Sequence, residues 1–337
     1  GGPAKILTSM SSSLGGSLSI ADFDCYEPRK WKSNVYNRER LEVKQKLVAL
    51  ARGVGGSVLG ADGSPLYIEA SVEHPALWNH KQVDSQSVFF SRHEAARKEL
   101  DGFIDRSKPM ASLVDDPTPQ HNHVFLAITV SHELLEVSLR LHPDARVDRQ
   151  NLERKLDDYY EAERLVSLLS ALSPGFRVGI TPELQPLSEL GEGSVTLEAL
   201  HEVIGKLPAG GALPMPGQLP RLFYIGVALP RSEAVALSAD ELSAWVGERL
   251  TELAAIYRFL AWSRDNDFVS MRQVLDKEKT VKRQRGLHKG DRVRVVRGML
   301  AGKDGLVQEV DAKGHLKVLV GKMVVKIDAA DVDRPQS

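Results

Sequence analysis

Histidines crowd one part of the sequence, and they are the first residues whose side chains could do chemistry. Seven of the ten lie between residues 74 and 142: His74, His80, His93, His121, His123, His132 and His142. His121 and His123 stand just before an apolar run, where strand alternation would place both imidazoles on one face. Two imidazoles there could begin a metal site, but no third ligand follows at a suitable spacing. We therefore interpret them as polar residues at the start of a strand, and we expect no metal.

Acidic residues near a lysine raise the question of a metal-dependent nuclease. In nucleases of the restriction type, carboxylates on adjacent strands hold a divalent metal, with a lysine close by. Glu69, Glu73, Lys81 and Asp84 are of the right types, but the usual acid-x-lysine spacing is absent. No catalytic residue is assigned from them.

Other candidates for catalysis are weaker still. Cys25 is the single cysteine, and its flanks, DFDCYEP, hold no cation that would lower the pKa of a thiol. A charged cluster is typical of surface ion pairs, although arginines beside a helix start could hold an anion: Arg140, His142, Asp144, Arg146 and Arg149. The sequence contains no phosphate-binding glycine loop and no Gly-x-Ser-x-Gly elbow. Nothing in the chain demands an enzyme.

Hydrophobic periodicity locates the elements that would hold these side chains. Helical spacing predicts helices over residues 35–52, 93–106, 148–172 and 238–262. Asp148 is expected to cap the third helix, and Ser238 with Glu241 to form a capping box for the fourth. Short β-rich runs predict strands within 64–73, 85–92, 123–143, 176–181 and 221–231, the third run holding two strands joined by a tight turn. The pattern predicts an α+β region with antiparallel sheets and long helices.

Changes in composition divide the chain into five parts. We expect a flexible leader over residues 1–20, an α+β region over 21–205, and its continuation over 206–271 after a stretch rich in proline and glycine. Residues 272–287 form a basic linker, and residues 288–334 a small all-β module. Lys282, Arg283 and Arg285 in the linker could face phosphate groups, although a basic run is also typical of a solvated linker.

The last part of the sequence is a set of short alternating strands. The runs RVRVV, GLVQEV, HLKVLV and MVVKID are separated by turn-forming residues and predict a small twisted β-barrel. Its expected core is Val293, Val295, Leu306, Val310, Leu316, Val318 and either Val324 or Val325. Gly302 and Gly305, preceded by Gly298, are expected to turn the chain between two strands, because glycine tolerates backbone angles that other residues resist. Lys303 and Asp304 would then stand out at the tip of the turn.

This segment resembles the KOW module of NusG-type transcription elongation factors and of several large-subunit ribosomal proteins. The residues that carry the resemblance are Gly290, Asp291 and Val293, and then the stretch VRGMLAGKDGLVQEVD with Gly298 and the Gly302-x-x-Gly305 pair. The resemblance covers the C-terminal part only. It implies a small barrel that binds RNA, DNA or a protein of the transcription or translation machinery, and it implies no catalysis.

Basic residues on the module make an independent argument for nucleic acid. They lie on or near its expected loops and outward strand faces: Arg292, Arg294, Arg297, Lys303 and Lys313. Phosphate contacts would give salt-sensitive affinity that does not depend on base sequence. Because the module contains no Phe, Tyr or Trp, the stacking of unpaired bases is disfavoured, and contacts to the nucleic-acid backbone, a duplex or a protein are favoured.

The overall composition limits the class of protein. With 44 basic and 45 acidic residues the chain is near neutral, so a nucleic-acid footprint must be local. The single cysteine and the lack of a run of about 18 apolar residues favour a cytoplasmic protein outside the membrane. The leading hypothesis is a binding protein that docks on RNA or DNA, or on RNA polymerase or the ribosome, without a cofactor; a homo-oligomer stays open. The alternatives are a metal-dependent nuclease or other nucleic-acid enzyme with the module as its targeting arm, and a pure protein–protein adaptor.

Overall fold

Two compact units make up the chain, one of residues 1–269 and one of residues 270–337. The computed structural model describes residues 16–60, 63–71, 82–104, 119–190, 195–210, 221–276, 287–311 and 315–334. Each unit has a hydrophobic core of its own. The first combines helices with an antiparallel sheet, so its class is α+β. The second is built around a smaller antiparallel sheet.

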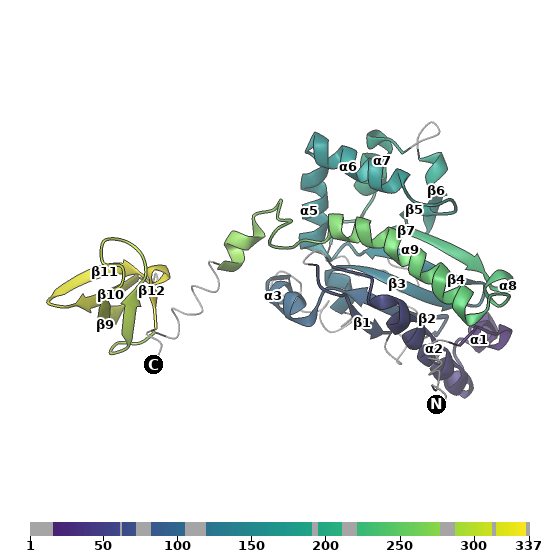
Figure 1. Ribbon diagram of the computed structural model, residues 1–337, viewed down its shortest axis with the longest axis horizontal. Helices are drawn as coiled ribbons and strands as arrows, with labels where there is room; N and C mark the ends of the chain where they lie inside the picture. The colour runs from purple at the N-terminus through teal and green to yellow at the C-terminus, as the bar shows by residue number, and fades with distance from the viewer. Residues whose placement is uncertain are drawn as a thin grey trace, which may run out of the picture. The chain divides into compact units, whose positions relative to one another are not determined.

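A seven-stranded antiparallel sheet is the frame of the first unit (Figure 1). Its strands are β1 (Tyr67–Ala70), β2 (Ser85–Ser91), β3 (Val124–Ser131), β4 (Leu134–Leu141), β5 (Arg177–Ile180), β6 (Glu183–Pro186) and β7 (Phe223–Pro230). Their order across the sheet is β1-β2-β3-β4-β7-β5-β6. Because β7 lies between β4 and β5, the stretches before and after residue 206 share one sheet.

Alternation of side chains gives this sheet a strongly apolar face. Leu126 of β3 stands opposite Leu139 of β4, and Ile128 stands opposite Val137, all four with no exposed surface. Burial of each such side chain stabilises the fold by roughly 1.5–3 kcal/mol. The two longest helices, α2 and α9, pack against the sheet and against each other (Figure 1). The sheet is therefore held mainly by this one helical layer.

The helices of the first unit differ widely in length. They are α1 (Ile20–Asp24), α2 (Asn37–Gly55), α3 (Glu94–Ile104), α5 (Arg146–Leu156), α6 (Tyr159–Ser170), α7 (Leu197–Gly205), α8 (Arg231–Ala234) and α9 (Ala239–Leu260). Short 3₁₀ helices lie at Pro28–Lys30, Asn34–Tyr36, Pro119–Asn122 and Leu187–Glu189. The predicted capping box of α9 is confirmed, since Ser238 N donates to Glu241 Oε2 at 2.8 Å and Glu241 N donates to Ser238 Oγ at 3.3 Å. No helix among the described residues is long and apolar enough to cross a membrane.

The single helix predicted over residues 148–172 is wrong, because two helices occupy this stretch. α5 ends at Leu156, and Asp158 caps the start of α6 by accepting a hydrogen bond from Glu161 N at 3.1 Å. A short carboxylate at this place favours a new helix start over continuation. Asp148 does not cap a helix either: it lies inside the first turn of α5, with 1% of its surface exposed.

Residues at the start of the described chain belong to the fold and not to a leader. The leader was predicted over residues 1–20, of which residues 1–15 lie outside the described part. Leu18 is buried in the main core, and α1 begins at Ile20. Ser19 starts this helix with a capping box that includes Asp22. The apolar side chain of Leu18 therefore fixes the chain onto the first unit before α1.

Five short strands form a curled sheet in the second unit (Figure 1). They are β8 (Arg292–Val295), β9 (Asp304–Val310), β10 (His315–Val320), β11 (Met323–Asp328) and β12 (Val332–Asp333), with a 3₁₀ helix at Ala329–Asp331. All pairs are antiparallel, in the order β11-β10-β9-β8-β12. The strand pattern predicted from the sequence fits this sheet in its coarse form.

The core of the second unit corrects part of the predicted list. Val293, Val295, Leu316 and Val318 are buried as expected, and Val307 joins them. Leu306 and Val310 are each 36% exposed, and Val324 is 58% exposed, whereas Val325 packs on the core. The reason lies in the register of β9, because Gly305 stands opposite the inward Val293 and an irregularity follows between Lys317 and Val318 of the partner strand.

Candidate nucleic-acid interface

The loop between β8 and β9, residues 296–303, holds two of the basic residues singled out in the sequence. It is closed at its base, where Val295 N donates to Lys303 O at 2.8 Å and Gly302 N donates to Val295 O at 2.6 Å. Gly298 and Gly302 both have a φ of 83°, in the left-handed region that favours glycine. The backbone of the loop is therefore a closed turn, and these two glycines shape it.

Gly305 is not a turn residue, contrary to the sequence prediction. It lies in β9 opposite Val293. A Cβ at this position would come within 2.4 Å of Val318 Cγ1 and 3.0 Å of Leu319 O. Gly305 is thus required for space beneath β10, since a side chain there would meet both a core methyl group and the backbone.

Arg294 was predicted to bind nucleic acid, but its charge is already balanced within the sheet. Its Nε donates to Asp304 Oδ1 at 2.7 Å and its Nη2 to Asp304 Oδ2 at 3.1 Å. The hydrogen bond from Arg294 holds the pKa of the Asp304 carboxyl below its usual range. A bidentate pair of this kind fixes both side chains. Asp304 therefore faces β8 and does not stand free at the tip of the loop.

Three other cations singled out from the sequence form no ion pair with a described residue. The side chains of Arg292, Arg297 and Lys303 are exposed, and none of them forms a hydrogen bond or ion pair with a described residue, although the charge of Arg292 helps to lower the pKa of the Asp304 carboxyl. The contrast is with cations elsewhere on the same sheet: Lys317 lies 2.6 Å from Glu309, Lys326 lies 3.5 Å from Asp311, and Arg334 lies 3.7 Å from Asp291. Positive charge without an ion pair is thus present at the loop and at the start of β8.

Further exposed residues of the unit were not among the binding candidates chosen from the sequence. Lys289 and Lys322 are exposed and, among the described residues, have no ion-pair partner. Met299 is fully exposed at the tip of the loop, between Gly298 and Gly302. The exposure of Met299 could have been predicted from its place between two turn glycines, because a residue there does not follow the alternating pattern of the strands. The loop therefore offers an apolar side chain between two cations.

Four residues singled out from the sequence lie outside the described part of the chain. They are Lys282, Arg283 and Arg285 of the basic linker, and Lys313 in the sequence between β9 and β10. Their role in binding stays a prediction.

The histidines near residue 121 have separate roles in the first unit. His123 has no exposed surface, and its Nε2 lies 2.8 Å from Asp101 Oδ1. Burial lowers the pKa of its imidazole. His121 instead stacks on His142, with ring centroids 4.2 Å apart. His123 is therefore an interior residue. Among the described residues, no group of three or more His, Cys, Asp or Glu side chains could hold a metal ion.

Charged residues considered for catalysis or anion binding are engaged within the first unit. Glu69 lies 3.1 Å from Arg97, while Glu73 and Lys81 are outside the described residues. Arg140 donates to Glu136 Oε1 of the same strand at 2.7 Å and to Thr129 Oγ1 of the neighbouring strand β3 at 3.0 Å. These contacts tie the sheet together.

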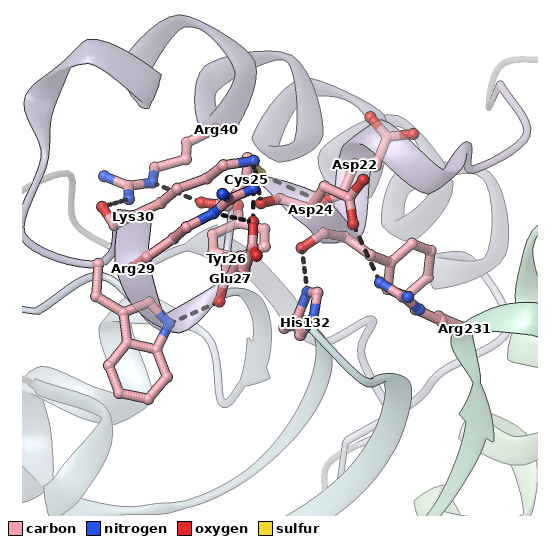
Figure 2. Close-up of polar contacts among 12 residues, drawn as sticks. Asp22, Asp24, Cys25, Tyr26, Glu27, Arg29, Lys30, Arg40, His132 and Arg231 are labelled. Atoms are coloured by element: carbon pink, nitrogen blue, oxygen red, sulfur yellow. Dashed lines mark hydrogen bonds and ion pairs between the residues drawn. The ribbon is translucent and has the colours of Figure 1, made fainter.

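Cys25 is a packed thiol (Figure 2). Arg40 donates to Cys25 O at 3.4 Å and to Lys30 O at 2.8 Å, which holds the turn after α1 against α2. Asp24 pairs with Arg231 at 3.0 Å on the other side. Cys25 is 2% exposed, and burial raises the pKa of its thiol to about 11. Because the thiolate is the reactive form, Cys25 is unsuited to nucleophilic catalysis.

Comparison with known proteins finds a partial likeness. No protein-family model matches the chain. Large ribosomal subunit protein uL24 of Methanoculleus marisnigri is 49% identical to it over 47 residues. The match takes in 14% of this chain and 39% of the ribosomal protein. The chain thus spans well under half the length of that relative.

Proposed function

We propose that the chain binds RNA and that its second unit makes the contact through the loop of residues 296–303 and the start of β8. The observation that carries this proposal is a set of exposed cations that form no ion pair with a described residue, Arg292, Arg297 and Lys303, on a chain whose net charge is −1. The likeness to a large-subunit ribosomal protein favours RNA over DNA. The curled five-stranded sheet and the sequence resemblance support a KOW-type module as the binding unit.

The chemistry of the loop suits contacts to phosphate groups. Each cation that meets a phosphate releases condensed counterions, which makes the affinity salt-dependent. Gly298 and Gly302 hold the loop in a closed turn, so its cations can bind with little loss of backbone entropy. Since residues 270–337 contain no Phe, Tyr or Trp, we propose a folded RNA with a continuous phosphate surface as the target.

The wider setting of the proposal follows from the same chemistry. Lys282, Arg283, Arg285 and Lys313 would add further positive charge to the part of the chain that binds RNA. The ribosome is the proposed assembly, and the cytoplasm the proposed compartment. The N-terminal unit, with its separate core, would then be the part that is carried to the RNA.

Binding measured across a salt series tests the function. The full chain would be titrated into three fluorescently labelled probes. They are a ribosomal RNA hairpin, one arm of that hairpin as single-stranded RNA, and a DNA duplex of the same sequence. We expect the hairpin to bind best, with the logarithm of its affinity falling linearly with the logarithm of salt concentration. Affinity that does not change with salt, or no binding at low salt, would contradict RNA binding and favour the alternative function of a protein–protein adaptor. A preference for the DNA duplex would contradict RNA as the target.

A further inference from the structure

An open sheet edge runs along β11 in the second unit. β11 is the outermost strand of the sheet and, within the described residues, pairs only with β10. It spans six residues, Met323–Asp328, and contains no proline. Natural proteins usually shorten or cover such edges, because their free N–H and C=O groups accept a further strand. This edge is long enough to pair with one.

An apolar row crosses the outer face of the sheet and ends at this edge. Leu306 of β9 stands opposite Leu319 of β10, which stands opposite Val324 of β11. Val324 is 58% exposed and Leu306 is 36% exposed. Cross-strand neighbours of this kind stabilise one another by contact. A further apolar side chain next to Val324 would continue the row and remove apolar surface from water.

A charged row lies two residues farther along the same face. Glu309, Lys317 and Lys326 stand opposite one another on β9, β10 and β11. Lys317 Nζ donates a hydrogen bond to Glu309 Oε2 at 2.6 Å, and this ion pair raises the pKa of Lys317. Lys326 faces Lys317, and like charges placed directly opposite are unfavourable. Its only ion pair among the described residues is the longer contact to Asp311, at 3.5 Å.

The two rows together specify a partner strand. Glu309 already stands beside Lys317 on one side of the row. A carboxylate on the partner strand would stand beside Lys326 on the other side. Val324 and Lys326 are two residues apart, which is the period of side chains on one face of a strand. We propose that β11 binds an extended segment of a partner protein that carries an apolar residue and an acidic residue two positions apart. Main-chain hydrogen bonds supply affinity in this mode of recognition, and alternate side chains supply specificity.

This surface uses none of the residues proposed to bind RNA. Its cations form ion pairs with Glu309 and Asp311, whereas Arg292, Arg297 and Lys303 form no ion pair with a described residue. The inference therefore stands or falls independently of RNA binding.

A model peptide tests the proposed strand addition. The probe is fluorescein-labelled Ser-Thr-Val-Thr-Glu-Thr-Val-Thr-Ser, and the control peptide carries Lys in place of Glu. Fluorescence anisotropy with the full chain should show the Glu peptide binding about five- to tenfold more tightly than the Lys peptide. Hydrogen–deuterium exchange should slow in the segment that contains β11. Equal binding of the two peptides, or protection confined to other segments, would overturn the proposal.

A charge reversal in the protein sharpens the test. Lys326→Glu should reverse the preference, so that the Lys peptide binds more tightly than the Glu peptide. Val324→Thr should weaken the binding of both peptides and leave the preference for the Glu peptide unchanged. Lys289→Glu makes the same change of net charge elsewhere in the unit and should leave the preference unchanged. If Lys326→Glu leaves the peptide preference unchanged, as Lys289→Glu should, the charged row does not determine which peptide binds. Protection of β11 that grows with protein concentration in the absence of peptide would instead assign the edge to a second copy of the chain.

Discussion

Arg92 and Asp148 form an ion pair in the interior of the first unit, with 8% and 1% of their side-chain surfaces exposed. Arg92 Nη2 donates to Asp148 Oδ1, and Arg92 Nη1 donates to Trp262 O at 3.2 Å. The same carboxylate accepts hydrogen bonds from Val124 N and from Trp262 N, each at 2.8 Å. One side chain of α5 therefore joins the end of β2, the start of β3 and the chain that follows α9.

Removing that carboxylate should destabilise the first unit strongly. Asp148→Ala leaves the Arg92 guanidinium buried without a counter-charge, and we expect the free energy of unfolding to fall by about 3–5 kcal/mol. Urea unfolding followed by tryptophan fluorescence measures it, since all four tryptophans lie at or before residue 262. Asp157→Ala is the matched control: its side chain is 70% exposed, and we expect a change within about 0.5 kcal/mol. Equal effects of the two substitutions would contradict this account.

Acid should weaken the first unit through His123. Burial lowers the pKa of the folded imidazole below the ordinary 6.5, so the unfolded chain takes up a proton first as the pH falls. The stability due to the neutral ring is therefore complete above 6.5 and is lost as the pH falls toward the folded pKa, with a slope of up to about 1.4 kcal/mol per pH unit. Arg92, Asp148 and Asp101 are the charged groups that face the ring.

Urea unfolding at a series of pH values measures this dependence. His123→Gln should flatten the curve just below pH 6.5, because the amide does not titrate. The titration of the Asp101 carboxyl can be distinguished from that of His123. Burial opposes the ionisation of this carboxyl, but the hydrogen bonds from His123 and Asn122 lower its pKa below 3.8. Its contribution to stability is therefore lost only in stronger acid. A variant curve that keeps the full slope below pH 6.5 would show that another group titrates there.

Gly302 and Gly305 should respond differently to the same substitutions. At Gly302 the φ of 83° makes alanine cost about 1–2 kcal/mol, and asparagine should cost less because it tolerates the left-handed region. At Gly305 the collision with Val318 makes alanine cost about 1–3 kcal/mol and asparagine more. Residues 270–337 contain no Phe, Tyr or Trp, so valine methyl resonances are the suitable probe of unfolding. The same order of alanine and asparagine at both positions would refute the distinction.

Arg297 should contribute to RNA affinity more than a paired cation does. Arg297→Ala should weaken binding to all RNA sequences alike and reduce the slope against salt by about 1, because one phosphate contact is lost. Titrations of the labelled hairpin at several salt concentrations measure both quantities.

Two controls separate local contacts from net charge. Lys317→Ala removes one positive charge, as Arg297→Ala does, but Lys317 is paired with Glu309 and should change the slope little. The double variant Arg294→Ala with Asp304→Ala keeps the net charge and should bind as the unaltered chain does, since the two side chains balance each other. If Arg297→Ala and Lys317→Ala lose affinity equally while the double variant keeps it, affinity follows net charge and the loop makes no specific contact.

Local patterns in the sequence predicted much of the secondary structure. β3 and β4 alternate so regularly that their register follows, and the capping box at Ser238 marks the start of α9. β6 and α7 escaped prediction, since β6 has four residues and α7 follows it after a short connection. Elements this short carry too few periodic positions to stand out.

The missed roles depend on contacts between residues distant in sequence. Asp148 looked like a helix cap because its partner Arg92 is 56 residues away and nothing nearby marks it. Gly305 looked like a turn residue because the obstructing methyl group of Val318 belongs to another strand. Likewise five cations of the module were singled out from the sequence, but only the fold shows that Arg294 pairs with Asp304 and that Arg297 has no described partner.

The place of β7 in the sheet has a consequence for synthesis on the ribosome. β4 emerges and pairs with β3 well before β7 is translated, although β7 is its neighbour on the other side. Until residue 230 has left the exit tunnel, the nascent first unit exposes the unpaired edge of β4 and its apolar side chains. An unpaired strand edge of this kind can accept another chain, and α9, which packs on β3 and β4, is translated only after β7.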